Sequence, residues 1–341
     1  MANKKLKVGI IGLGVGEQHI IGYRNHPNCE VKLLCDFDHQ KLKDVKKRYP
    51  DYLYSTNDND ILDDPEIDIV SIASFDNYHS RQILKSLETN KHVFVEKPLC
   101  LHDEEFISIY KALKRNRDLC LSSNLILRYT PRFLNLKNKL DRDQMGDIYL
   151  LEASYDYGRI HKITSGWRGE IPFYSVMHGG GIHLIDLLLW LTNQKIIEVN
   201  TVGTKIATQH TQFKYADCMT SILKFESGAI GSLTSNYSAM IPHGHRLSLY
   251  GTKSTFHHGP LGCAYFSSRD PKSSPEIIND PYPGSSKGDM IPKFVDNILD
   301  RGIPPAVTCQ EVLDSMAVSL AIENSYKSKI SQMVEYRSII D

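Results

Sequence analysis

The sequence lacks the features that define several classes of protein. No apolar run reaches the roughly 18 residues that a membrane-spanning helix needs. The 40 basic and 40 acidic side chains cancel, so the chain has no excess of positive charge with which to bind a nucleic-acid backbone. The seven cysteines are scattered without a Cys-x-x-Cys pair, which favours free thiols in a reducing compartment. We therefore expect a cytoplasmic protein with neither a membrane nor a nucleic acid as its partner.

A chain of 341 residues is long enough for two domains, because single cores rarely grow beyond about 250–300 residues. In the first third, short β-branched runs alternate with helical patterns. The runs lie at residues 7–11, 31–35, 67–73, 92–95 and 119–122. Strands separated by helices indicate a parallel sheet with right-handed crossovers. The sequence therefore predicts an α/β Rossmann domain, with a doubly wound parallel sheet, over residues 1–123.

The pattern changes after residue 124. Alternating apolar and polar residues predict strands at residues 148–157, 198–205, 217–225, 229–237, 245–250 and 254–257. Helical patterns cover residues 182–191, 291–300 and 312–328. Residues 267–290 are rich in Ser, Pro, Asp and Gly, which predicts a long surface loop. Residues 124–341 are thus expected to form an α+β domain with a large, open, mostly antiparallel sheet, and its last helix is expected to pack back on the first domain.

The first predicted strand runs straight into Gly12-Leu13-Gly14-Val15-Gly16. Such glycines permit a tight turn and let a pyrophosphate approach the next helix, whose amino terminus favours negative charge. The last glycine comes one residue earlier than in the usual Gly-x-Gly-x-x-Gly pattern. Asp36 follows the second predicted strand at the spacing of the acid that binds the adenosine ribose. A carboxylate there repels a 2′-phosphate, so Gly12, Gly14, Val15, Gly16 and Asp36 predict a site for NAD rather than NADP.

The predicted strand at residues 92–95 ends in Glu96-Lys97-Pro98. Ligands of doubly wound sheets bind at the carboxyl ends of the strands, so Lys97 is expected to project toward the cofactor. Its ammonium group can hydrogen-bond a substrate hydroxyl and stabilise the alkoxide that forms as hydride leaves. The tripeptide by itself fits a solvated surface lysine before a turn proline equally well. The other motifs of the chain decide between this interpretation and a catalytic lysine.

Six motifs follow one another in the order and spacing of one family. They are Gly-Leu-Gly-x-Gly from Gly12, Asp36, Asn77-Tyr78-His79, Glu96-Lys97-Pro98, Trp167-Arg168 and Gly181-Ile182-His183-Leu184-Ile185-Asp186. From Lys7 to near Lys327, the sequence resembles the glucose–fructose oxidoreductase / inositol dehydrogenase (Gfo/Idh/MocA) family. This resemblance implies a Rossmann domain followed by an open-sheet domain that binds substrate and joins a homodimer or homotetramer. It also implies NAD(P)-dependent oxidation or reduction of a carbon of a sugar, a cyclitol or a nucleotide-linked sugar.

The resemblance also assigns roles to residues at matching positions. It implies that Lys97 and His183 are catalytic. Beside the glycine turn and Asp36, the residues that it places at the cofactor are Ser74, Asn77, His79, Glu96, Lys97, Trp167 and Arg168. The residues that it places at the substrate are Lys97, Asn124, Arg128 and His183.

Other polar residues of the second half suggest further substrate contacts. Tyr157, Arg159 and Lys162 come shortly before Trp167, and such side chains bind hydroxyl-rich or anionic ligands. A solvated loop is the alternative, but if the two cations face the pocket, a negatively charged substrate such as a nucleotide sugar is favoured. His243 lies in a loop that is expected to line the same pocket. Its histidine neighbours have no cysteine or carboxylate cluster beside them, so we expect no metal.

One position departs from the family pattern. Many dehydrogenases of the family carry Asp four residues before the histidine, where this chain has Gly179. On a regular helix that carboxylate would face His183 and orient its imidazole. Three alternatives follow: His183 uses another partner, His178 takes a substituted role at the substrate, or His183 only binds substrate and leaves Lys97 as the main proton carrier. We favour the last.

The sequence therefore predicts an NAD-dependent oxidoreductase that acts on a secondary alcohol or ketone of a sugar-like substrate. Two alternatives remain open. A dihydrodiol or tetrapyrrole type of reductase would use the same scaffold on another substrate. The absence of a carboxylate at Gly179 is compatible with this alternative. A non-catalytic NAD-sensing regulator has no reason to keep a proton-carrying lysine, so Lys97 weighs against it.

Overall fold

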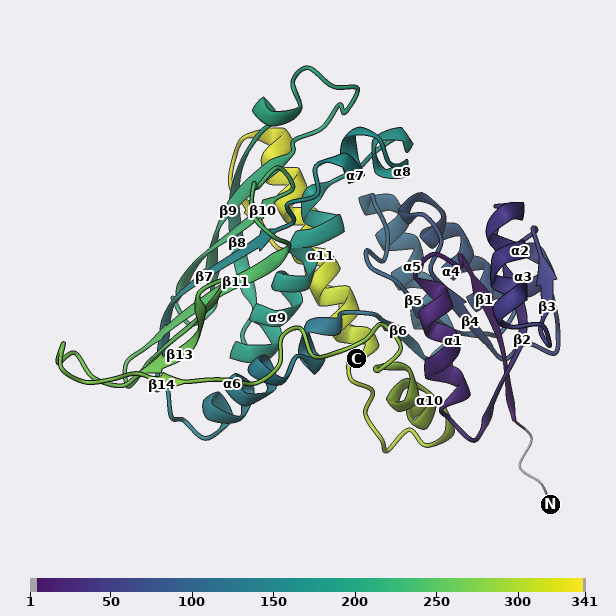
Figure 1. Cartoon of the computed structure of the whole chain (residues 1–341), viewed down its shortest axis with the longest axis horizontal. Helices are drawn as coiled ribbons and strands as arrows, with labels where there is room; N and C mark the ends of the chain where they lie inside the picture. Colours follow the sequence, from purple (N-terminus) through teal and green to yellow (C-terminus); the bar gives the residue numbers. More distant parts are fainter. Residues whose placement is uncertain (1–4, 340–341) are drawn as a thin grey trace. The chain divides into compact units, whose positions relative to one another are not determined.

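The computed structural model describes residues 5–339, and the chain divides into two compact units (Figure 1). The first unit runs to Ile126 and also takes in Ser286–Leu313 and the residues from Arg337 on. The second unit comprises Leu127–Ser285 and Asp314–Tyr336. The sequence predicted a single boundary, between residues 123 and 124, with a last helix that packs back on the first domain. Within residues 5–339, no helix is long and apolar enough to cross a membrane.

The first unit is built on a six-stranded parallel sheet in the order β3-β2-β1-β4-β5-β6. Its strands are β1 Leu6–Ile11, β2 Cys29–Cys35, β3 Leu53–Ser55, β4 Ile69–Ile72, β5 His92–Val95 and β6 Leu121–Ser123. The order of the strands reverses between β1 and β4, which pair in register up to Ile11 and Ile72. The predicted doubly wound α/β fold is confirmed, and its ligand site is expected at the carboxyl ends of β1 and β4.

Helices connect these strands. They are α1 Gly16–Arg24, α2 His39–Arg48, α3 Asn59–Leu62, α4 His79–Glu88 and α5 Asp103–Arg115, with a 3-10 turn η1 at Asp76–Tyr78. The start of α2 is fixed by Asp38, whose carboxylate accepts hydrogen bonds from the backbone N–H groups of Gln40 and Lys41. Helix α10 Ile291–Leu299 comes from the returning segment and packs beside α1 (Figure 1).

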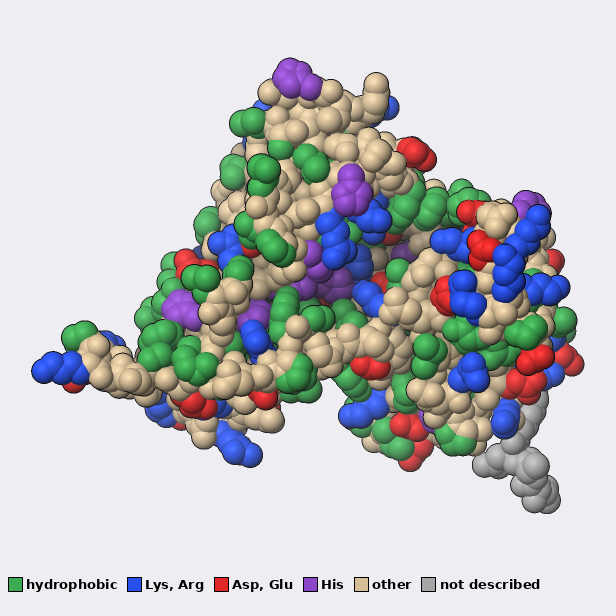
Figure 2. Space-filling view, viewed as in Figure 1, with side chains coloured by type: hydrophobic (Ala, Val, Ile, Leu, Met, Phe, Trp, Pro, Cys, Tyr) green, Lys and Arg blue, Asp and Glu red, His purple; other side chains and the backbone are tan. Residues whose placement is uncertain are grey.

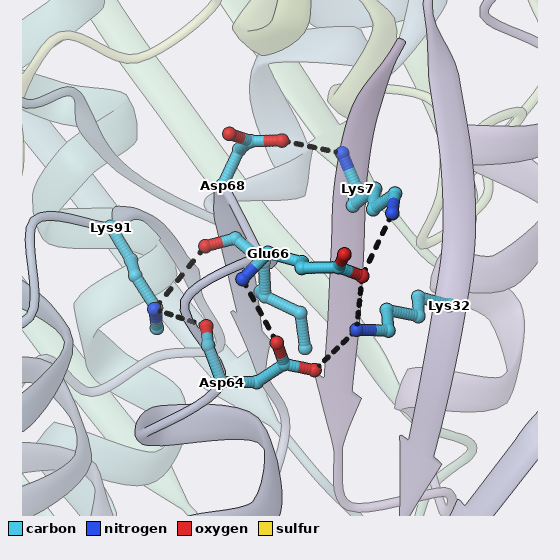
Figure 3. A network of polar contacts seen from close by, with 7 residues as sticks. Lys7, Lys32, Asp64, Glu66, Asp68 and Lys91 are labelled. Atoms are coloured by element: carbon cyan, nitrogen blue, oxygen red, sulfur yellow. Dashed lines mark hydrogen bonds and ion pairs between the residues drawn. The ribbon is translucent and has the colours of Figure 1, made fainter.

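A network of charged side chains lies at the amino-terminal edge of the parallel sheet (Figure 3). Lys32 Nζ contacts Asp64 at 2.6 Å and Glu66 at 2.8 Å, and Lys7 Nζ reaches Glu66 at 2.9 Å. The buried Lys91 donates to the backbone carbonyl of Asp64 at 2.7 Å. Because this edge is opposite the carboxyl ends of the strands, we assign the network to stability and not to ligand binding. Acidic and basic side chains are also interspersed over the surface of this unit (Figure 2).

The second unit carries a nine-stranded sheet in the order β14-β13-β12-β11-β7-β10-β9-β8-β15. Its strands are β7 Ile148–Asp156, β8 Ile196–Thr204, β9 Cys218–Phe225, β10 Ile230–Asn236, β11 Gly244–Gly251, β12 Thr255–Gly259, β13 Gly262–Phe266, β14 Glu276–Ile277 and β15 Gln332–Met333. Only β7 and β10 pair in parallel, so the predicted mostly antiparallel sheet is confirmed. The predicted surface loop over residues 267–290 contains the short strand β14, and its first part projects between β13 and β14 with basic side chains at its tip (Figures 1 and 2).

The two faces of this sheet differ in burial. In β9, Met219 and Leu223 are buried on one face, whereas Ile222 is 58% exposed on the other. The buried face shares one hydrophobic core with α9 Ile182–Thr192 and α11 Cys309–Ser328. The remaining helices of the unit are α6 Pro131–Asp141, α7 His161–Thr164 and α8 Trp167–Glu170, with a π-helical turn η3 at Met177–Gly181.

Candidate functional site

The glycine turn after β1 has the geometry of a cofactor cradle. Gly12 has a φ of +86°, and a Cβ there would lie 2.6 Å from the backbone nitrogen of Ser74 and closer still to the Ala73 carbonyl. Only glycine fits both constraints. A Cβ on Gly14 would meet nothing nearer than Lys41 Nζ, at 3.8 Å, among the described residues. Helix α1 then begins at Gly16, so the turn leaves room for an anion in front of a helix amino terminus.

Asp36 lies where the sequence predicted it, at the end of β2, and is buried. One carboxylate oxygen accepts a hydrogen bond from Leu13 N–H at 2.8 Å, and the other accepts from Asp38 N–H at 3.0 Å. The side chain therefore holds the glycine turn in place. Each carboxylate oxygen has two lone pairs, so acceptor capacity remains for the hydroxyls of a ribose. The residues of β1, α1 and β2 thus fit an NAD(P) adenosine diphosphate.

The loop after β4 holds the next group of predicted cofactor residues. His79 is fully buried, and its ring nitrogens lie 2.7 Å from the Pro98 carbonyl and 3.2 Å from the Ser74 carbonyl. It therefore ties this loop to the turn after Lys97 and positions both. The Oδ1 atom of Asn77 is buried and has no hydrogen-bond partner within residues 5–339. Of the predicted residues in this loop, Asn77 has the acceptor that a bound ligand can use.

Glu96 and Lys97 follow β5 at the carboxyl edge of the sheet. The Glu96 side chain is buried, and Asn124 Nδ2 donates to its Oε1 at 2.7 Å. His19 Nε2 lies 3.5 Å and Lys287 Nζ lies 3.9 Å from the same oxygen. Burial alone would raise the pKa of Glu96, but the charge of Lys287, the contact with His19 and the charge of Lys97 hold the pKa well below its usual range. Glu96 is therefore a buried anion.

Lys97 itself is only partly buried, at the tip of the strand. His19 and Lys287 were not among the residues predicted for this site. Neither residue belongs to the motif, and only folding brings α1 and the returning segment to the end of β5. Asn124, which was predicted to contact substrate, is fully buried and donates to Glu96 and to the Lys287 carbonyl.

A cluster of aromatic and imidazole rings lies in the second unit, where β7 and β10 end. The Tyr155 ring stacks on Tyr157 at 5.6 Å and on His183 at 6.3 Å between centroids. Tyr157 lies 4.6 Å from Tyr237 and 5.2 Å from His243. Burial raises the pKa values of Tyr155 and Tyr237 well above the ordinary range, so these phenols stay protonated. The structure thus brings the predicted Tyr157, His183 and His243 together, and adds two tyrosines that the sequence did not single out.

Residue 179 lies under this ring cluster. A Cβ on Gly179 would be 2.8 Å from the Tyr237 hydroxyl and would collide with the Tyr174 hydroxyl. The turn Met177–Gly181 is also π-helical. Residues 179 and 183 are therefore not one regular α-helical turn apart on the same face, as the sequence analysis assumed. Two tyrosine hydroxyls therefore occupy the space in which a side chain at residue 179 would lie.

Other predicted substrate residues have partners inside the second unit. Arg128 donates to the two carboxylate oxygens of Asp186 at 2.9 and 2.6 Å, and both side chains are buried. His178 Nδ1 lies 2.7 Å from the Ser319 hydroxyl of α11. These contacts fix α9 and the π-helical turn. A role of Arg128 or His178 at the substrate stays a prediction.

Two arginines lie against aromatic rings near the cluster. The Arg159 guanidinium is 5.4 Å from the Tyr157 centroid, and Arg159 is exposed. The Arg168 guanidinium is 4.5 Å from the Trp167 centroid. Both positive charges act on Tyr155, where they oppose the effect of burial on its pKa. The cofactor role of Trp167 and Arg168 stays a prediction.

Comparison with known proteins places this geometry in context. Residues 6–124 match the family model described as an oxidoreductase family with an NAD-binding Rossmann fold, and residues 133–257 match the GFO/IDH/MocA C-terminal domain. The chain is 23% identical to myo-inositol 2-dehydrogenase of Thermotoga maritima, over 97% of this chain and 99% of that protein. It is 25% identical to scyllo-inositol 2-dehydrogenase (NAD(+)) of Bacillus subtilis, over 95% of each chain.

Solved structures share the fold over nearly the whole chain. Levoglucosan dehydrogenase, in complex with NADH and levoglucosan, superposes with a TM-score of 0.85 at 19% identity and covers 98% of this chain and all 100% of its own. The scyllo-inositol dehydrogenase of Lactobacillus casei, with bound NAD(H) and scyllo-inositol, gives a TM-score of 0.80 at 19% identity, with coverage of 97% and 99%.

Proposed function

The chain belongs to the Gfo/Idh/MocA family of oxidoreductases, and from this premise we propose that it is an NAD-dependent dehydrogenase of a sugar or a cyclitol. It would move a hydride to or from a secondary carbinol carbon. One observation carries the proposal: Lys97 follows β5 at the same carboxyl edge of the parallel sheet as the glycine turn after β1. A proton carrier and a dinucleotide cradle thus share one edge.

The cofactor half of the proposal rests on the first unit. NAD, when bound, supplies the acceptor or donor of the hydride. The turn from Gly12 to Gly16 would hold its pyrophosphate, and Asp36 would accept the ribose hydroxyls. A carboxylate at that position repels a 2′-phosphate, which supports NAD over NADP. The buried Asn77 oxygen would accept a hydrogen bond from the nicotinamide half.

The proton-transfer half rests on Lys97. During oxidation its amine would take the proton of the substrate hydroxyl, and during reduction its ammonium would return that proton to the new alkoxide. His183 would bind a substrate hydroxyl and hold the reacting carbon in place. The phenols of Tyr155 and Tyr237 stay protonated, so they would serve as neutral hydrogen-bonding groups and not as bases.

The ring cluster supports a polyhydroxylated substrate. Tyrosine and histidine present an apolar ring with a polar edge, which suits a sugar ring that has C–H faces and hydroxyl rims. This composition weighs against the apolar substrate of a dihydrodiol or tetrapyrrole type of reductase. Arg159, which is exposed and stacked on Tyr157, favours a second class of substrate in which the sugar carries a phosphate or nucleotide.

We also propose that the chain forms a homo-oligomer through the open face of its nine-stranded sheet. Four large apolar side chains on four different strands are more than half exposed in the single chain. They are Tyr149 at 52%, Val202 at 68%, Ile222 at 58% and Ile230 at 54%. A second copy of the same sheet would cover them.

The proposal is tested by a screen for NADH fluorescence with both NAD and NADP. The substrates are myo-inositol, scyllo-inositol, levoglucosan, simple aldoses and nucleotide sugars. Lys97→Met is expected to lower kcat by about 10²–10⁴-fold while NAD still binds. If the wild-type protein binds NAD but turns over none of these substrates, the NAD-sensing regulator becomes the better explanation and the proposed function is wrong.

A further inference from the structure

Helix α11 carries a line of buried polar side chains that faces the segment around His183. Ser315, Ser319 and Glu323 follow one another at intervals of four residues, so they lie on one face of the helix. All three are buried, and all three belong to the second unit. A buried polar group costs stability unless a hydrogen bond compensates it. The partners of these side chains therefore indicate what the line does.

Two of the partners lie within and beyond the π-helical turn Met177–Gly181. The Ser319 hydroxyl is 2.7 Å from Nδ1 of His178, the second residue of the turn. The Ser315 hydroxyl donates to Asp186 Oδ1 at 3.3 Å, one turn of α9 after His183. The line on α11 thus contacts the chain on both sides of His183.

The third partner lies just before the turn. The Ser175 hydroxyl donates its hydrogen to the carboxylate of Glu323 and accepts the backbone N–H groups of Met177 at 3.1 Å and His178 at 3.2 Å. A hydroxyl has one hydrogen and two lone pairs. Because Glu323 takes the hydrogen, both lone pairs of Ser175 are directed to the turn. Glu323 therefore orients the group that receives the first backbone N–H groups of the turn.

The turn has little else with which to hold its own shape. It contains Gly179, Gly180 and Gly181, and glycine loses more conformational freedom on folding than any other residue. The Tyr155 ring packs directly over Gly180, where a Cβ would lie 2.5 Å from two of its ring carbons. The same ring stacks on His183, the second residue of α9. A displaced turn would therefore move His183 relative to the ring on which it stacks.

We propose that Glu323 is a positioning residue for His183: through the Ser175 hydroxyl it fixes the π-helical turn, and so it sets where the His183 imidazole lies in the ring cluster. This inference rests on the proposed function only for the task of His183 there, which is to bind a substrate hydroxyl. The position of the imidazole is a property of the chain itself, so it can be measured without a substrate.

The measurement uses the stacking of His183 on Tyr155. The two rings are 6.3 Å apart between centroids and inclined at 23°, so the ring current of the tyrosine acts on the Cε1–H signal of the histidine. The full chain is labelled with carbon-13 histidine, and the His183 signal is the one that His183→Asn removes. We expect this signal to shift in Glu323→Ala and in Ser175→Ala. Glu323→Gln keeps an oxygen that can accept the Ser175 hydrogen, and it should restore the wild-type position of the signal.

Ser325→Ala is the matched control. Ser325 is a buried serine of the same helix whose hydroxyl accepts Thr201 N–H at 3.0 Å and donates to the Ile330 carbonyl at 2.8 Å. The variant loses hydrogen bonds of the same kind, so it should lower the melting temperature. Because these partners lie outside the segment around His183, the His183 signal should stay in place.

Kinetics give a second readout where the screen finds a substrate. Glu323→Ala should raise KM by about tenfold with kcat nearly unchanged, because a displaced His183 loses its hydrogen bond to substrate and the proton carrier is untouched. Glu323→Gln and Ser325→Ala should keep the wild-type KM. A purely structural role of Glu323 would lower the stability and leave both KM and the His183 signal as they are.

Several outcomes overturn the inference. They are an unmoved His183 signal in Glu323→Ala or in Ser175→Ala, an equal shift in Ser325→Ala, and a shift in Glu323→Gln as large as that in Glu323→Ala. If Glu323→Ala fails to fold, Ser175→Ala decides by itself, since it removes only one oxygen atom. Turnover with an unmoved signal would refute this inference and leave the proposed function standing. NAD binding without turnover would refute the proposed function, and the NMR comparison would still decide whether Glu323 positions His183.

Discussion

The hydroxyl groups of Tyr174 and Tyr237 share a 2.8 Å hydrogen bond directly beside Gly179. Both side chains are buried, and their rings pack at 5.9 Å between centroids. The space that a carboxylate side chain at residue 179 would need is occupied by the hydroxyl groups of these two tyrosines. Residue 179 therefore gives His183 no anionic partner. This arrangement agrees with a substrate-binding His183 and a proton-carrying Lys97.

Gly179→Ala is expected to destabilise the protein by about 1–3 kcal/mol, because the new methyl group collides with the tyrosine pair in a closed core. Thermal unfolding of the two proteins measures the effect. Gly259→Ala is the matched control, since a Cβ there meets its nearest neighbour, Arg246, at an ordinary 3.6 Å. If Gly179→Ala and Gly259→Ala lose the same amount of stability, the tyrosine pair is not the reason why residue 179 must be glycine.

His183→Asn is expected to raise KM by about tenfold while kcat changes little, because one hydrogen bond to substrate is lost and the proton carrier remains. Steady-state kinetics with the substrate from the screen give both constants. His210→Asn, which changes an exposed histidine of the same unit, serves as the control. A large fall in kcat with KM unchanged would instead make His183 the main acid or base.

Asp36→Asn is expected to weaken NAD binding by about tenfold and to narrow the difference between NAD and NADP. The amide oxygen can still accept the Leu13 N–H bond, so the glycine turn should survive, while the negative charge that repels a 2′-phosphate is gone. Dissociation constants for both dinucleotides, measured by fluorescence, test this. Asp51→Asn, an exposed position of the same unit, is the control. An unchanged ratio of the two constants would contradict the role given to Asp36.

Ile222→Glu is expected to reduce the oligomer to a smaller species, because a charge would be placed on β9, between the strands that carry the exposed Ile230 and Val202. Light scattering coupled to size-exclusion chromatography measures the mass in solution. Ile206→Glu changes an isoleucine of the same unit that is 72% exposed but lies outside the strands, and it should leave the mass unchanged. A wild-type protein that is already monomeric would refute the proposed interface.

The sequence predicted the features that repeat along the chain and missed those that depend on tertiary packing. The apolar run of β1, the alternation of β9 and the glycines of the Gly12 turn are local patterns that sequence alone reveals. Strand β3, at Leu53–Ser55, is three residues long and has no readable period. The contact between Glu96 and Lys287 joins segments that are distant in the sequence, so no local pattern predicts it. The tyrosines that pack against the glycines of the π-helical turn before His183 likewise lie outside that turn in the sequence.

His92 gives the fold a defined sensitivity to acid. Its Nδ1 accepts a hydrogen bond from Cys120 N–H at 2.9 Å, which links β5 to the start of β6 and requires an unprotonated nitrogen. Burial, reinforced by the positive charge of Arg301, lowers the pKa of His92 from 6.5 to about 4. The unfolded chain therefore binds a proton at a higher pH than the folded protein does. The resulting stabilisation is complete above pH 6.5 and is lost as the pH falls from 6.5 to 4.

We expect His92→Asn to remove this dependence, because the asparagine oxygen can accept the same hydrogen bond but does not titrate. Between pH 7 and pH 4, the wild type should lose about 1–3 kcal/mol more stability than the variant, allowing for the partial exposure of the ring. Urea denaturation at the two pH values measures the difference, and His39→Asn, at an exposed histidine of the same unit, should behave as wild type. If the wild type and His92→Asn lose stability in parallel, protonation of His92 is not the cause of acid sensitivity.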